Sequence, residues 1–174
     1  MLDLKGYGLK GLSSVSKQIV ISISQQTLTV FEHQRDVKRY SVSTGLKGAG
    51  CEKNSGKTPL GKHIIRAKIG DNMPLNSVFV GRRATSEIYS TELAQAQPDR
   101  DWILTRILWL SGQELGINRL GNVDTMQRYI YIHGTPDTEP MGKPLSHGCI
   151  RMRNQDLIEL FDSIAPFTQV EITL

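Results

Sequence analysis

The sequence lacks the features that would assign it to a membrane, disulfide-rich or repeat-built class. It contains no internal repeat and no run of ~18 apolar residues, the length that a membrane-spanning helix needs. Its two cysteines are Cys51 and Cys149. Two are too few for a disulfide framework, and neither lies in a CxxC pair typical of zinc or redox sites. The 174 residues therefore fit one globular domain with a single core.

Long blocks of one charge are also missing. The formal net charge is +4 and the isoelectric point is about 9.1, a balance that suits an acidic partner. However, lysine and arginine are spread along the chain, with no block longer than Arg82-Arg83, which favours a solvated basic surface. We therefore expect no nucleic-acid partner and no stable insertion into a membrane. The sequence does not indicate an oligomeric state.

The N-terminus does not resemble a secretory leader. Residues 1–17 hold Asp3, Lys5 and Lys10 among several glycines and lack the apolar segment of a signal peptide. We interpret residues 1–17 as an N-terminal arm and residues 18–174 as the folded domain. The protein either stays in the cytoplasm or is exported with a leader that this sequence does not include.

Most of the domain is predicted to form β-strands. Alternating apolar residues in 18–24 and 27–31 flank the polar pair Gln25-Gln26, which is the pattern of a hairpin. A helix is predicted from an N-cap at Asn154 to a point before Pro166. The fold class is therefore mainly β, with one or more short helices. Further strands are predicted at residues 37–44, 62–69, 102–110, 128–132 and 168–174, loops at 45–59, 112–125 and 135–145, and nothing definite at 71–100.

The segment from His133 to Arg153, HGTPDTEPMGKPLSHGCIRMR, has the clearest chemical content. The thiolate is the reactive form of cysteine, and a free thiol has a pKa near ~8.5, so catalysis at neutral pH needs a basic neighbour. His133 and His147 are the candidates for the base of Cys149. We favour His133, because it arrives from a different element, whereas His147 is separated from Cys149 by a single glycine.

Neighbouring residues suggest supporting roles, and they also suggest one rival site. Gly148 has no Cβ, so backbone N–H groups near it can approach a developing oxyanion. Arg151 is placed to hold a substrate carboxylate. The rival is a zinc site formed by His133, His147 and Cys149. Because HxC is not a usual structural zinc pair and no acidic general base accompanies it, we expect no metal.

The stretches IHGT and SHGCIRM, with Cys149 sixteen positions after His133, resemble the signature of the L,D-transpeptidase catalytic domain, the YkuD-like family. Thr58-Pro59-Leu60-Gly61 resembles the TPxG turn of that family, and the hairpin leading to Ser43-Thr44-Gly45 resembles its usual start. The resemblance covers about residues 18–174. It implies a β-sandwich-like catalytic fold with the cysteine in a groove under a loop.

The resemblance also implies an activity. The substrate would be the stem peptide of bacterial peptidoglycan, no metal or organic cofactor would be needed, and the site of action would be the cell envelope or periplasm. Cys149 would be the nucleophile and His133 the general base. The supporting residues implied are Gly134, whose carbonyl holds the imidazole, His147 and Gly148 around the oxyanion, and Ser146 and Arg151 at the substrate.

Three functions remain open at this point. In an L,D-transpeptidase, Cys149 forms a thioester at the L-centre of the diamino acid, D-Ala leaves, and an amine takes the acyl group. In an L,D-carboxypeptidase or endopeptidase, water takes it instead. The third function, of a different class, is a module that binds wall peptides without turning them over.

Overall fold

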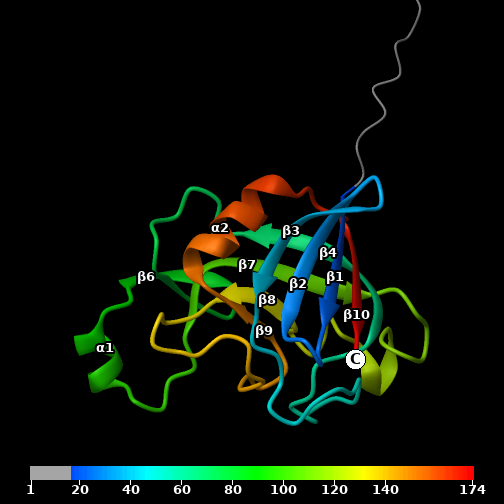
Figure 1. Ribbon diagram of the computed structural model, residues 1–174. Coiled ribbons are helices and arrows are strands. Elements are labelled where there is room, and N and C mark those ends of the chain that lie inside the picture. Colours follow the sequence, from blue (N-terminus) through cyan, green and yellow to red (C-terminus); the bar gives the residue numbers. More distant parts are fainter. Residues whose placement is uncertain (1–16) are drawn as a thin grey trace, which may run out of the picture.

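The computed structural model describes residues 17–174, so the predicted arm over residues 1–17 lies outside the described residues except for Lys17, where the first strand begins. The domain is mainly β with short helices, as predicted (Figure 1). The elements are β1 (Lys17–Ser22), β2 (Thr27–Glu32), β3 (Arg35–Ser41), β4 (Gly61–Ile69), β5 (Ser77–Val80), β6 (Arg83–Ile88), α1 (Thr91–Ala96), β7 (Ile103–Gly112), the 3-10 helix η1 (Gly121–Val123), β8 (Tyr131–Gly134), β9 (Ile150–Met152), α2 (Asn154–Ser163) and β10 (Gln169–Thr173).

The strands form one mixed sheet that forks at β7. Its main path runs β3-β2-β1-β10-β4-β7-β5-β6, and β8 leaves this path by pairing with β7 on one side and β9 on the other. The pairs β1–β10 and β8–β9 are parallel, and the other pairs are antiparallel. Because of this fork, β8 and β9 do not pair with the N-terminal strands, but their side chains pack into the same hydrophobic core.

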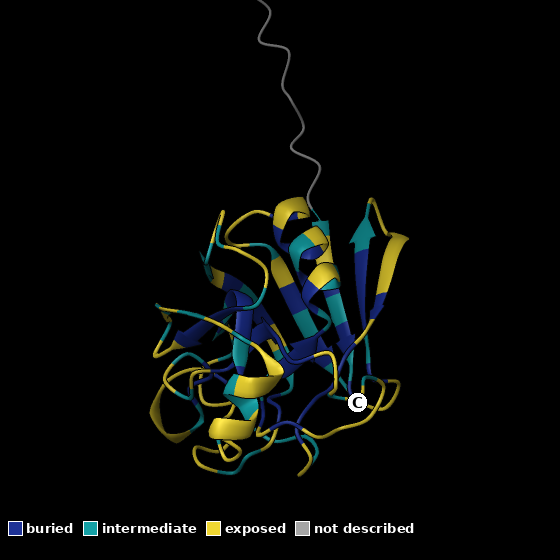
Figure 2. Ribbon diagram, turned by 90° about the vertical axis from the view of Figure 1, so that its left-hand side faces the viewer, coloured by how far each residue is buried: buried dark blue, intermediate teal, exposed yellow. Residues whose placement is uncertain are grey.

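One large cluster of buried side chains connects the strands to α2. The alternation predicted for the first strand is confirmed, because Ile19 and Ile21 are fully buried between more exposed neighbours. Ile132 of β8 and Ile150 of β9 enter the same cluster, together with Leu157 of α2. Figure 2 shows buried segments inside and exposed turns and helix faces outside. The described part of the chain has no helix that is long and apolar enough to cross a membrane.

The strand predicted at residues 128–132 is shifted in the structure. β8 begins three residues later, and residues 125–129 form turns instead. The backbone carbonyl of Asp124 accepts from the N–H of Arg128 at 2.9 Å, its carboxylate accepts from the N–H of Gln127 at 3.0 Å, and Tyr129 takes a left-handed φ of 57°. These local bonds compete with strand pairing, so His133 lies within the strand, with Gly134 at its end.

The helix start is also one residue different from the prediction. Arg153 is the N-cap, and Asn154 is the first helical residue. The Asn154 side chain is buried and bonds to other segments. It accepts from the hydroxyl of Thr105 at 2.7 Å and donates to the carbonyl of Thr135 at 2.9 Å and to the side chain of Asn76 at 3.1 Å. Asn154 therefore fastens the start of α2 to β7 and to the loop after β8.

The segment without a sequence assignment, residues 71–100, forms β5, β6 and α1. Ser90 caps α1 by accepting from the N–H of Leu93 at 3.2 Å. Trp102 is buried and meets Tyr89 edge to face, with the ring centres 5.1 Å apart. Trp109 is half-buried and faces the opposite side of the sheet from the main core.

Replacing Asn154 by alanine should destabilise the domain. The change removes three hydrogen bonds and leaves the buried Thr135 carbonyl without its donor, so we expect the free energy of unfolding to fall by about 2–3 kcal/mol. Gln155→Ala, at an exposed position of the same helix, should change it by less than about 0.5 kcal/mol. Urea unfolding of both variants checks this, and equal stability of the two would contradict the role given to Asn154.

Candidate active site

His133 lies in β8, and Cys149 directly precedes β9, the strand that pairs with β8. Ile132 pairs with Ile150, and His133 pairs with Arg151, in the parallel β8–β9 ladder. Because side chains alternate along a strand, Ile132 and Ile150 enter the core, while the next residue of each strand, His133 or Arg151, faces the other side. The Cys149 Sγ accepts a hydrogen bond from the N–H of Tyr131 at 3.4 Å. The thiol therefore lies against the start of β8, the strand that carries the imidazole.

The imidazole of His133 is held in one tautomer. It is 1% exposed, and its Nδ1 lies 2.8 Å from the carbonyl oxygen of Gly134. Since a carbonyl oxygen accepts only, Nδ1 carries the proton, and Nε2 keeps a free lone pair. A Cβ on Gly134 would collide with the Asn154 side chain and would lie 2.7 Å from the carbonyl of Leu104. The close packing at Gly134 therefore fixes the carbonyl that orients His133.

The SHGC segment is shaped by its own serine and by the TPLG turn. Ser146 is buried, donates to the carbonyl of Cys149 at 2.5 Å and accepts from the N–H of Gly148 at 3.1 Å. Gly148 has a φ of 119°, a conformation that favours glycine. The hydroxyl of Thr58 donates to the carbonyl of Gly148 at 2.9 Å and accepts from the N–H of Gly45 at 2.8 Å. Two loops far apart in sequence thus fix the turn before Cys149.

Arg151 is bound to two carboxylates. Its guanidinium lies 2.9 Å from Asp101 and 3.4 Å from Glu139, and its side chain is 10% exposed. His147 is 83% exposed, and its Nδ1 lies 3.8 Å from the other carboxylate oxygen of Asp101. Sequence reasoning did not identify Asp101, because it lies just before β7 without a motif around it. Asp101 contacts both His147 and Arg151, which lie two residues before and two residues after Cys149.

Burial shifts the pKa values of the thiol and the imidazole in opposite directions. Burial raises the pKa of Cys149 to about 11, and the hydrogen bond from the Tyr131 N–H offsets part of this effect, followed by Arg151 and Arg128. Burial lowers the pKa of His133 below its usual value. Both shifts favour the uncharged forms. At neutral pH the resting pair is therefore a thiol beside a neutral imidazole rather than a thiolate beside an imidazolium.

An arginine and three aromatic rings form a wall next to Cys149. Arg82, from the turn between β5 and β6, donates to the hydroxyl of Tyr131 at 2.9 Å, and its guanidinium lies 4.6 Å from the ring centre of Trp109 and 4.8 Å from that of Tyr129. Tyr131, Trp109 and Cys149 belong to one packed cluster. The sequence did not indicate that Arg82 lies at the site, since the hairpin that carries it was not predicted.

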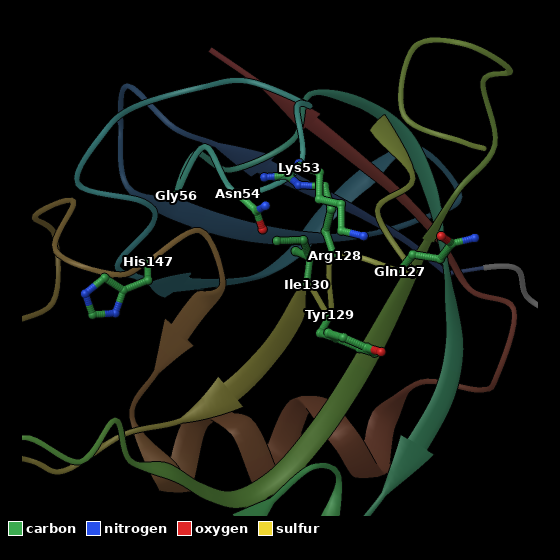
Figure 3. Close-up of a pocket in the computed structure, with 8 residues that line it drawn as sticks. All are labelled: Lys53, Asn54, Gly56, Gln127, Arg128, Tyr129, Ile130 and His147. Atoms are coloured by element: carbon green, nitrogen blue, oxygen red, sulfur yellow. The ribbon is translucent and has the colours of Figure 1, made fainter. Parts of the chain in front are cut away.

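A pocket of about 410 Å³ adjoins this wall and shares Tyr129 with it. In the view of Figure 3, His147 lies at one end of it and Gln127 at the other. Its walls come from the loop before the TPLG turn, from the turn that precedes β8, and from the SHGC segment. The lining residues are Lys53, Asn54, Gly56, Gln127, Arg128, Tyr129, Ile130 and His147.

Metal ligation has little support from the geometry. Within residues 17–174, no three His, Cys, Asp or Glu side chains are grouped so that they could hold a metal ion. His147, one of the three ligands of the rival zinc hypothesis, extends into solvent beside Asp101. Cys51 and Cys149 are both free thiols, and the Cys51 sulfur lies 3.9 Å from the carbonyl of Leu60.

The fold is that of L,D-transpeptidases. An L,D-transpeptidase structure from Mycobacterium smegmatis superimposes with a TM-score of 0.56 at 18% identity, over 92% of this chain and 59% of that chain. One from Xylanimonas cellulosilytica gives 0.51 at 19% identity, over 92% and 62%. This chain thus spans less than two thirds of either structure.

The sequence match is more specific. Residues 16–172 match the YkuD family, described as the L,D-transpeptidase catalytic domain. The YkuD protein of Bacillus licheniformis is 26% identical over 166 residues, which cover 95% of this chain and 71% of the relative. The chain belongs to the YkuD family of L,D-transpeptidase catalytic domains.

The neutral resting pair predicts an unusual alkylation profile for Cys149. In a Cys51→Ser background, the rate of reaction with iodoacetamide should rise with pH toward a midpoint near 11, the pKa that burial gives this thiol. In the urea-unfolded chain the midpoint should return to about 8.5. Mass spectrometry at fixed times measures both rates. A rate in the folded protein that stays constant between pH 6 and 9 would indicate a preformed ion pair instead.

Proposed function

We propose that the protein transfers acyl groups of peptidoglycan stem peptides through a thioester on Cys149. The observation that carries this proposal is the pairing of β8 with β9. It brings a thiol to the start of the strand that carries a buried imidazole whose Nδ1 is bound to the Gly134 carbonyl. A nucleophile, a base and a group that orients the base are the parts that nucleophilic catalysis needs. Membership of the YkuD family points to the stem peptide as substrate.

In the first half of the proposed reaction, Nε2 of His133 takes the proton of the Cys149 thiol as sulfur attacks the carbonyl at the L-centre of the diamino acid. The C–N bond then breaks, and His133 returns the proton to the amine of the departing D-Ala. The N–H of Gly148 already donates to Ser146, so we assign the oxyanion mainly to the N–H groups of Cys149 and His147.

In the second half, an acceptor amine attacks the thioester. His133 receives a proton from the amine, the C–S bond breaks, and the sulfur of Cys149 regains a proton. Hydrolysis follows the same path with water in place of the amine. Arg151 is proposed to bind a substrate carboxylate only if that carboxylate displaces Asp101 or Glu139 from its guanidinium. Ser146 supports the site through the shape of the turn rather than by direct contact.

Relatives supply a covalent probe for this proposal. The structure of an L,D-transpeptidase of Mycobacterium tuberculosis was solved with a faropenem-derived adduct, and that of LdtMt1 was solved in complex with imipenem. Both ligands are β-lactams, which react with acyl-transfer nucleophiles. We therefore expect imipenem to acylate Cys149. We also expect the protein to act at the cell envelope, where its substrate is found.

The decisive experiment follows D-Ala exchange. The protein is incubated with a purified disaccharide-tetrapeptide and an excess of another D-amino acid, and the products are weighed by mass spectrometry. Transfer predicts a tetrapeptide with the new terminal residue. Release of tripeptide alone would establish hydrolysis. Cys149→Ala should abolish both products, and Cys51→Ser should leave them unchanged. Equal turnover by wild type and Cys149→Ala would refute the thioester mechanism.

The link between the TPLG turn and the SHGC segment should matter for reactivity. Thr58→Val keeps the side-chain shape but leaves the Gly148 carbonyl without its donor, so we expect acylation of Cys149 by imipenem to slow about 10-fold. Thr58→Ser restores the hydroxyl and should remain within about 3-fold of wild type. Stopped-flow absorbance measures the rates, and thermal unfolding checks the fold. An unchanged rate in Thr58→Val would show that this hydrogen bond does not position the nucleophile.

A further inference from the structure

The pocket beside the thiol is lined by cations and by no anion. Lys53, Arg128 and His147 can carry positive charge, and the other five lining residues are neutral (Figure 3). Its volume of about 410 Å³ suits a small part of a peptide rather than a whole stem. A concave site with one sign of charge concentrates ligands of the opposite sign. The pocket therefore fits a small anionic group.

Arg128 is the strongest sign that a ligand is expected there. Its guanidinium donates to the carbonyls of Gly50 at 3.2 Å and Lys57 at 2.6 Å and to the hydroxyl of Ser55 at 3.4 Å, all of them neutral acceptors. No carboxylate of residues 17–174 forms an ion pair with it. Burial lowers the pKa of Arg128 below its usual value. A half-buried charge without a counter-ion is costly unless a ligand supplies one.

The pocket adjoins the reacting sulfur. The carbonyl of Tyr129, a wall residue, accepts from the Cys149 thiol at 3.5 Å. His147, another wall residue, is separated from Cys149 only by Gly148. The charge of Arg128 also reaches the thiol, where it opposes the effect of burial on the pKa of Cys149. An anion bound in the pocket therefore lies close to the carbonyl that Cys149 attacks.

We propose that this cationic pocket binds the free C-terminal carboxylate of the donor peptide, and equally the carboxylate of an incoming D-amino acid. The inference rests on the proposed function. Release of the last residue puts its carboxylate one residue beyond the scissile carbonyl, a span of at most about 3.6 Å along the chain. Arg128 precedes Tyr129, whose carbonyl lies 3.5 Å from the Cys149 sulfur, whereas Arg151 is already bound to Asp101 and Glu139.

The same carboxylate site serves the departing and the entering residue. When the amine of a D-amino acid attacks the thioester, the new C–N bond replaces the C–S bond, and the product is the donor peptide with a different last residue. This is the reverse of thioester formation, so by microscopic reversibility the entering carboxylate occupies the position that the departing one left. The positive lining disfavours an ammonium group in this position.

Lys53 offers a clean test, because its side chain is exposed and forms no hydrogen bond or ion pair within residues 17–174. The test compares a tetrapeptide acid with its C-terminal amide. We expect wild type to prefer the acid about 10-fold in kcat/KM, as for a charge-assisted hydrogen bond. Lys53→Glu should lower kcat/KM for the acid about 10-fold and change that for the amide by less than about 3-fold. Lys53→Arg should retain the preference.

The matched control is Lys47→Glu, which makes the same change of charge on the same loop outside the pocket. It should leave the preference for the acid unchanged. Equal rates for acid and amide in wild type, an equal loss on both substrates in Lys53→Glu, or the same effect from Lys47→Glu would each overturn the proposal. So would a preference that depends on the carboxylate of the second residue of the stem instead. Failure of the proposed function itself is distinct, because then neither peptide is turned over and imipenem does not label Cys149.

Discussion

The parallel pairing of β8 with β9 is the constraint on which the site depends. It aligns His133 with Arg151 and leaves Cys149 against the backbone of Tyr131. The pairing is secured from the opposite face, where Ile132, Ile150 and Met152 are fully buried in the main core. A slip of one residue would exchange the two faces, so burial of these three side chains also fixes the position of the thiol and the imidazole.

The core that holds the pair also sets its charge state. His133 is almost fully enclosed, and the thiol lies against Tyr131 and Trp109, so both groups are partly removed from water. Desolvation favours the neutral thiol and the neutral imidazole. In the proposed mechanism, proton transfer from sulfur to Nε2 therefore accompanies attack on a substrate carbonyl rather than preceding it. The hydrogen bond from Nδ1 to Gly134 prepares the imidazole for that step, because it stabilises the ring once it becomes positive.

The two arginines near the site differ in whether a carboxylate neutralises their charge. Arg151 is neutralised by Asp101 and Glu139 and belongs to the framework that carries the SHGC segment. Arg128 has only neutral acceptors, and with Lys53 it leaves the pocket beside Tyr129 positively charged. We therefore assign a structural role to Arg151 and propose that Arg128 binds the substrate. The hydroxyl of Thr58 fixes the turn before Cys149, since it donates to the carbonyl of Gly148.

The sequence by itself determined the mainly β class, the opening hairpin and the family, and it predicted the catalytic cysteine and histidine, because periodicity and the SHGC motif are local features. It misplaced the start of β8, where the bonds of Asp124 and the left-handed φ of Tyr129 replace strand pairing. It did not indicate the contacts that Asp101 and Arg82 make at the site, and it marked Thr58 only as part of the TPLG turn. Those residues acquire their roles from contacts between segments far apart in the chain. Arg128 keeps an unpaired charge because the fold places no carboxylate of residues 17–174 in an ion pair with it. Only the tertiary structure decides which charges are neutralised and which remain, because that depends on burial and on neighbours that no local pattern encodes.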